Sequence, residues 1–111
     1  MAEIQGLYKA EFMTPEHHGY GVLSISGGAA RGGDSIMIYD GHYRFSGNDV
    51  TLDLEVTRHS HFRSMAPIFG KDSCTLNING KLLDDGRIVG SGYSPEARNI
   101  PFKVILKKMR S

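Results

Sequence analysis

Histidines are the residues of this chain with the clearest capacity for metal chemistry. His59 and His61 are two residues apart, so on an extended strand both imidazoles face the same way, and His17 or His18 could supply a third ligand. The pair is flanked by two arginines, whose positive charge disfavours a cation, and no carboxylate at ligand spacing completes the set. We therefore expect solvated histidines at a strand end and no bound metal.

The other reactive groups lack the surroundings that catalysis needs. Cys74 is followed in phase by Leu76 and Ile78, which indicates a core thiol, whereas a nucleophilic cysteine needs a partly exposed, electropositive setting. The glycine pairs at 27–28 and 32–33 are not followed by the Lys-Ser/Thr pair or the helix of a phosphate-binding loop. No serine lies in a nucleophile elbow. We predict no catalytic residue, no cofactor and no enzymatic activity.

Composition and charge limit the kinds of partner and the cellular location that we expect for this protein. The 111 residues carry a net charge of +1, which is too balanced for a nucleic-acid binder, and the basic residues near the C-terminus fit a solvated strand face. No apolar run approaches the roughly 20 residues of a membrane-spanning helix, and the first residues lack the pattern of a signal peptide. We expect one cytoplasmic domain over residues 1–111, with neither nucleic acid nor membrane as a partner.

Alternation of apolar and polar residues indicates the elements that position these groups. Residues 50–57 alternate without a fault, so that Val50, Leu52, Leu54 and Val56 share one face of a strand, whereas a helix would scatter them. Further strands are expected at residues 6–13, 19–26, 34–39, 42–45, 74–82, 87–93 and 100–107.

Glycine, Asn and Asp residues separate these strands. Reversals are expected at Gly27-Gly28, Asp40-Gly41, Gly47-Asn48 and residues 84–86, with a bulge at Asn79-Gly80. Residues 60–71 break the alternation and form a loop or one helical turn. Closing the sheet on itself would remove its exposed edges. We therefore predict an all-β, eight-stranded antiparallel up-and-down barrel, lipocalin-like, with at most one short helical turn, in preference to a two-sheet sandwich.

Five large side chains in the first strands are candidates to line a ligand cavity: Tyr8, Phe12, Met37, Tyr39 and Tyr43. Their phenolic hydroxyls could orient a ligand in an apolar pocket. A packed core is the favoured interpretation, because in so short a chain every inward position must also stabilise the barrel.

Three motifs occupy the first half of the chain: Gly6-x-Tyr8-x-x-x-Phe12, Gly19-x-Gly21-Val22-Leu23 and Gly32-Gly33-Asp34-x-x-x-x-Tyr39-x-Gly41. With them the chain resembles the GrlR family, whose founding members are negative regulators of type III secretion. The resemblance implies an eight-stranded lipocalin-like barrel that has an apolar cavity, forms a homodimer and binds a protein partner, a transcriptional activator in the founding members. We expect a non-enzymatic regulatory protein of this kind; the alternative is a barrel that carries a small apolar ligand.

One hairpin departs from the family pattern. The family's regulators carry Glu-Asp-Glu-Asp before the fifth strand, at the site associated with the activator, whereas this chain has Ser46-Gly47-Asn48-Asp49. The fold is unaffected, but the partner contact is expected to differ. An apolar group in the connection at residues 60–71 would plug one barrel mouth or form a dimer contact. The candidate interaction surface comprises Asn48, Asp49, Met65, Ile68 and Phe69.

Overall fold

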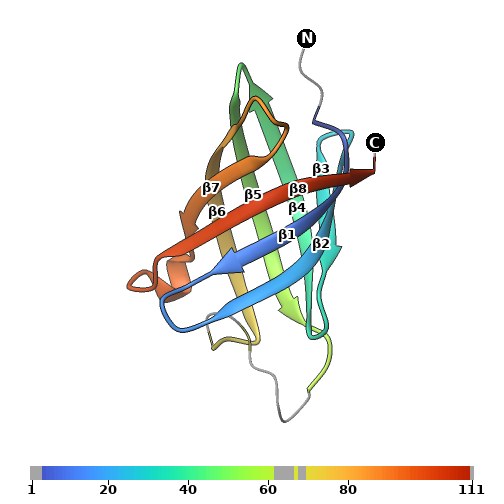
Figure 1. Ribbon diagram of the computed structural model, residues 1–111. Helices are drawn as coiled ribbons and strands as arrows, with labels where there is room; N and C mark the ends of the chain where they lie inside the picture. The colour runs from blue at the N-terminus through green and yellow to red at the C-terminus, as the bar shows by residue number, and fades with distance from the viewer. Residues whose placement is uncertain (1–3, 62–66, 68–69, 111) are drawn as a thin grey trace.

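The chain folds into a closed antiparallel β-barrel (Figure 1). The computed structural model describes residues 4–61, 67 and 70–110. In these residues eight strands follow one another around the barrel in chain order, and β8 returns to pair with β1, which confirms the predicted all-β up-and-down barrel. A single 3-10 turn, η1, follows β7, and no helix in the same residues is long and apolar enough to cross a membrane. The elements are β1 (Gly6–Met13), β2 (His18–Ser26), β3 (Ala29–Gly33), β4 (Met37–Ser46), β5 (Asp49–Arg58), β6 (Ser73–Leu82), β7 (Ile88–Tyr93), η1 (Pro95–Ala97) and β8 (Phe102–Arg110).

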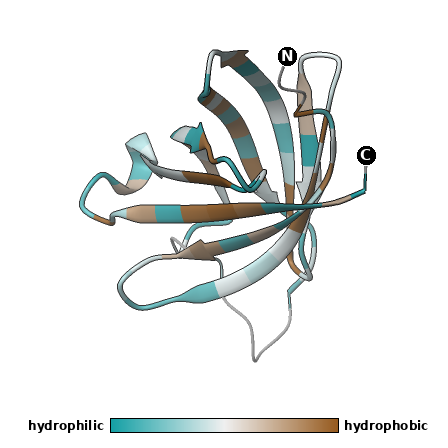
Figure 2. Cartoon of the chain, turned by 45° about the horizontal axis from the view of Figure 1, so that its top comes forward, coloured by the Kyte–Doolittle hydropathy of each residue, from teal (hydrophilic) through white to brown (hydrophobic). Residues whose placement is uncertain are grey.

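The core forms because successive side chains of each strand point to opposite faces of the sheet. In β5 the side chains of Val50, Leu52, Leu54 and Val56 are buried, and those between them face outward. Figure 2 shows the same alternation of hydrophobic and hydrophilic residues along the strands. Burial of each large apolar side chain stabilises the fold by about 1.5–3 kcal/mol, so this pattern drives the sheet to close around its apolar face.

One end of the barrel is closed by packed side chains. Tyr8 is fully buried there, and its hydroxyl donates a hydrogen bond to the carbonyl oxygen of Ile4 (2.6 Å), which ties the segment before β1 to the barrel. Ile25, opposite Gly6 at the start of β1, and Ile88, opposite Leu82 at the start of β7, are also buried. Both chain termini lie at the upper end of the barrel in Figure 1. Any space for a ligand therefore lies in the half of the barrel away from the chain termini.

The predicted reversal at Asp40-Gly41 is wrong. Both residues lie inside β4, which pairs with β3 on one side and with β5 on the other. A Cβ at position 41 would lie 1.9 Å from the carbonyl oxygen of Asp53 on β5. Gly41 therefore serves the close approach of two strands and not a turn of the chain.

The third strand also lies elsewhere than predicted. The chain reverses at Gly27-Gly28 as expected, but the next strand is β3, and the following reversal is at residues 34–36. The sequence of β3, Ala-Ala-Arg-Gly-Gly, contains no β-branched or aromatic residue, so pairing with β2 and β4 holds it in place rather than its own propensity. The bulge predicted at Asn79-Gly80 is absent as well, since β6 keeps a continuous register with both β5 and β7 there.

The two shortest strands of the barrel are β3 and β7. Each pairs with only part of an adjacent longer strand, so that β2 extends beyond the end of β3 and β6 extends beyond the end of β7. The η1 turn lies against β6, where the Glu96 carboxylate accepts a hydrogen bond from the backbone N–H of Thr75. On the other side, β3 pairs with Val22–Ser26 of β2, so the first residues of β2 extend past it. The turn at residues 34–36 lies beside this extension, because a Cβ on Gly21 would be 3.3 Å from the Cβ of Asp34.

Replacing Gly41 by alanine should lower the free energy of unfolding by about 3 kcal/mol, because the added methyl group meets a backbone oxygen of β5. Gly80→Ala is the matched control near the end of β6, where the nearest atom to the new Cβ is 3.0 Å away and the loss should be about 1 kcal/mol or less. Urea denaturation measures both values. Equal losses in the two variants would contradict the close β4–β5 contact.

Candidate functional site

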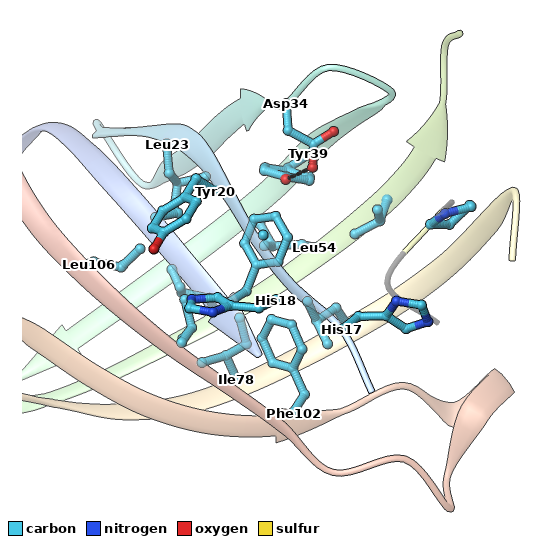
Figure 3. A pocket seen from close by; sticks show the side chains of 18 of the residues that line it. His17, His18, Tyr20, Leu23, Asp34, Tyr39, Leu54, Ile78, Phe102 and Leu106 are labelled. Carbon is cyan, nitrogen blue, oxygen red and sulfur yellow. Dashed lines mark hydrogen bonds between the residues drawn. The ribbon is translucent and has the colours of Figure 1, made fainter. Parts of the chain in front are cut away.

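A cavity of about 280 Å³ occupies the half of the barrel that lies away from the chain termini. This half is hollow, although a packed core was the favoured expectation. Figure 3 shows side chains that surround the space, which come from β1, β2, β4, β5, β6 and β8 and from the segments that connect strands. The lining consists of Ala10, Phe12, His17, His18, Gly19, Tyr20, Leu23, Asp34, Ser35, Ile36, Tyr39, Leu52, Leu54, Val56, Pro67, Leu76, Ile78, Phe102, Val104 and Leu106.

The wall of the cavity is apolar because the strands turn every second residue inward. β5, β6 and β8 contribute mainly aliphatic side chains by this alternation. Phe12 stacks on Phe102 with ring centroids 6.4 Å apart, and it meets the ring of Tyr39 edge to face at 6.2 Å. These three rings form an aromatic group beside the aliphatic wall, suited to a flat or branched apolar molecule.

Asp34 and Tyr39 form a hydrogen-bonded pair at the edge of the cavity (Figure 3). Asp34 Oδ1 accepts hydrogen bonds from the backbone N–H groups of Ile36 (2.9 Å) and Met37 (2.8 Å), and Oδ2 accepts one from the Tyr39 hydroxyl. The carboxylate thus fixes the turn between β3 and β4 and the direction of the phenol at once.

Two glycines of β2 make room for these side chains. A Cβ on Gly21 would lie 2.9 Å from the hydroxyl oxygen of Tyr39, and a Cβ on Gly19 would lie 2.6 Å from a ring carbon of Phe12. The Gly19-x-Gly21 spacing therefore allows the aromatic group and the Asp34–Tyr39 pair to approach β2.

Burial raises the pKa of the Tyr39 phenol well above its usual value of about 10, and the hydrogen bond to Asp34 and the negative charge of that residue raise it further. Tyr39 is only 9% exposed. The phenol therefore stays protonated and neutral over the physiological range of pH.

His59, which follows β5, contacts the backbone of the Asp34 turn. Its Nε2–H donates a hydrogen bond to the carbonyl oxygen of Asp34 (3.0 Å), and its Nδ1 accepts one from the Ser60 hydroxyl (2.8 Å). His59 is thus exposed, as expected, but both of its ring nitrogens are engaged. His61 is exposed close by, and in residues 4–61, 67 and 70–110 no three His, Cys, Asp or Glu side chains gather as a metal site would require.

Of the five residues predicted to line a cavity, two do so and three do not. Phe12 and Tyr39 line the cavity. Tyr8 and Met37 are buried but lie outside its lining, Tyr8 at the closed end and Met37 at the start of β4. Tyr43 is half-buried, packs against the core and also lies outside the lining.

Several lining residues were not anticipated as site residues. The sequence predicts Asp34 as the last named residue of the Gly32-Gly33-Asp34 motif and the first of a strand, and its carboxylate chemistry was missed. An Asp whose side chain can accept hydrogen bonds from the backbone N–H groups that follow it was the available signal. Phe102 shares the inward phase of Val104 in β8, which would have placed it in the lumen. His18 enters the lining through its place at the start of β2, which no spacing rule indicates.

The candidate interaction surface is described only in part. Asn48 and Asp49 are exposed at the turn between β4 and β5. The Asp49 carboxylate forms an ion pair with Lys81, which offsets its negative charge. Pro67, in the connection between β5 and β6, is buried and lines the cavity. The other three candidates lie outside the described residues: Met65, Ile68 and Phe69.

Cys74 is a buried free thiol on the inner face of β6 and does not belong to the cavity lining. Burial raises the pKa of the thiol, which lowers the fraction of reactive thiolate. The expectation of a core cysteine is therefore confirmed.

No model of a known protein family matches this chain, and no curated protein matches it significantly. The case for a function therefore rests on the chain's own motifs and on the geometry of the cavity.

The Tyr39→Phe variant tests the buried Asp34–Tyr39 pair. Since Tyr39 stays protonated, the wild type and the variant should show the same rise in phenolate absorbance as the pH passes through about 10, as long as both stay folded. A pKa raised in the folded state gives stability that is complete below the unfolded value and lost as the pH rises further. The free energy of unfolding should therefore fall more steeply above about pH 10 in the wild type. An extra tyrosine titrating in the folded wild type would contradict the pair.

Proposed function

We propose that this protein binds a small apolar molecule inside the open half of its barrel. The observation that carries the proposal is the cavity of about 280 Å³, whose wall is apolar and whose polar groups gather at one edge. Ligand pockets in proteins have this character, since a few polar groups set the orientation of a mostly apolar guest. Protein interiors are otherwise filled to the density of organic crystals, and unfilled volume lowers stability. A small barrel keeps such a space most readily when the space serves binding.

The volume limits the size of the ligand. A cavity of about 150 Å³ holds one benzene molecule, so about 280 Å³ suits a guest of about 10 to 15 non-hydrogen atoms. The proposed role requires no catalytic group, in keeping with the expectation of a non-enzymatic protein.

The neutral probe 1-octanol tests the proposal. We expect it to bind the wild type, with a negative heat-capacity change in calorimetry that marks burial of apolar surface. Ala10→Leu should weaken binding at least about tenfold, because the larger side chain enters the cavity from β1. Ala29→Leu is the matched control, since residue 29 faces outward near the closed end and lies outside the lining.

Two results would count against a lumen site. The first is failure of the wild type to bind 1-octanol at any concentration below its solubility. The second is equal loss of binding in the Ala10→Leu and Ala29→Leu variants, which would place the probe outside the barrel.

We also propose, as a second function, protein binding in the manner of the GrlR-type regulators that the three motifs resemble. One observation favours it: Val22 and Ile38 are 44% and 51% exposed on the outer face, and both pair with Gly33, which lies between them without a side chain. Tyr20, which is 58% exposed and also borders the cavity, extends this apolar row along β2. We propose that a second copy of the chain covers the row to form a homodimer. A cytoplasmic protein partner, such as a transcriptional regulator, would then contact the turn at Asn48 and Asp49.

The dimer is tested by sedimentation velocity. We expect the wild type to be dimeric at micromolar concentration and the Val22→Ser/Ile38→Ser double variant to be monomeric, because exposed apolar rows of this kind are typical of interfaces. Val89→Ser, on β7 and 37% exposed, is the control that should remain dimeric. A wild type that stays monomeric as its concentration is raised would remove this second proposal.

A further inference from the structure

The polar edge of the cavity offers hydrogen-bond acceptors. The Tyr39 hydroxyl donates its one proton to Asp34, so the phenol oxygen has only lone pairs left for a ligand. The raised pKa of Tyr39 keeps that proton in place. The Asp34 carboxylate accepts hydrogen bonds from two backbone N–H groups and the phenol, and it has no proton to donate. A ligand group that reaches these oxygens must therefore be a donor.

The charge at this edge has one sign. Asp34 is the carboxylate of the described lining, and no Lys or Arg is among the described residues that surround the space. The ring of His18 donates its Nε2–H to Glu11 (2.7 Å), a residue of β1 that is not part of the lining. An anionic head group at this edge would therefore meet two acceptor oxygens, and the described lining contains no Lys or Arg to balance its charge; its basic side chains are the imidazoles of His17 and His18.

We infer that the barrel selects small amphiphiles with a primary ammonium group at one end and an apolar body at the other. The inference rests on the proposed binding of apolar molecules in the lumen and names the class of ligand. The apolar body would lie against the aliphatic wall and the rings of Phe12 and Phe102, and the ammonium group would donate hydrogen bonds to Asp34 and Tyr39.

The position of the pair at the edge makes binding of a cation favourable. A charge buried in an apolar interior loses its hydration at a large cost. Asp34 is only half-buried, and its neighbour Ser35 is exposed, so an ammonium group at this edge keeps part of its water while it gains a charge-assisted hydrogen bond. A neutral alcohol gains a weaker bond there, and a carboxylate is repelled.

Three probes of one chain length separate these effects: octylammonium, 1-octanol and octanoate. Calorimetry at neutral pH should give octylammonium about tenfold tighter binding than 1-octanol, with octanoate the weakest of the three. This order requires no variant and does not depend on how a substitution affects folding.

The Asp34→Asn variant should bring the octylammonium and 1-octanol affinities to within about threefold of each other, because it removes the charge. The amide oxygen can still accept the two backbone hydrogen bonds that hold the turn. Glu11→Gln is the matched control: it removes a negative charge from β1, outside the lining, and should preserve the tenfold preference.

The outcomes distinguish the inference from the function on which it rests. If 1-octanol binds but octylammonium binds no more tightly, or if Asp34→Asn retains the full preference, the ammonium selectivity is overturned and the apolar site stands. If none of the three probes binds the wild type, both proposals fall.

Discussion

Pairing between the first and last strands is the contact on which the rest of this structure depends. β1 joins β8 from Leu7 opposite Arg110 to Met13 opposite Lys103, with one shift of register between Leu7 and Tyr8. Without this pairing the sheet would keep two open edges, and its apolar face would meet solvent along its whole length. Once it forms, the side chains of Ala10 and Phe12 face a lumen enclosed by strands rather than an open surface.

Side-chain size then divides that lumen into two halves. At the end with the termini, the side chains of Tyr8 and Ile4 fill the interior, and the hydrogen bond from the Tyr8 hydroxyl to the Ile4 carbonyl oxygen holds the two segments together. At the other end Gly19 and Gly21 add no side chains, and the short strand β3 gives way to the turn that Asp34 holds. The same few residues, the two glycines of β2 and the Asp34 turn after β3, therefore both leave the cavity open and place its hydrogen-bond acceptors.

The overall architecture could be predicted from the sequence where one signal was dominant. The alternation of residues 50–57 identifies β5 and its inner face, since nothing else in the segment competes with it. Gly41 misled the prediction because a glycine that allows two backbones to approach looks, in sequence, like a glycine that turns the chain. The strand β3 was missed because its residues have low strand propensity and are held by their neighbours. The residue pattern could not decide between a packed core and a cavity, because the outcome depends on how side chains of distant strands fill one volume.

Contacts between bound 1-octanol and individual methyl groups would test the hollow half of the barrel most directly. Nuclear Overhauser effects on methyl-labelled protein can report them. We expect contacts to Leu54, Leu76 and Ile78, which line the cavity, and none to Ile4 or Ile25 at the closed end. Contacts confined to the outer residues Val22 and Ile38 would show that the probe lies on the surface, and would contradict a binding site inside the barrel.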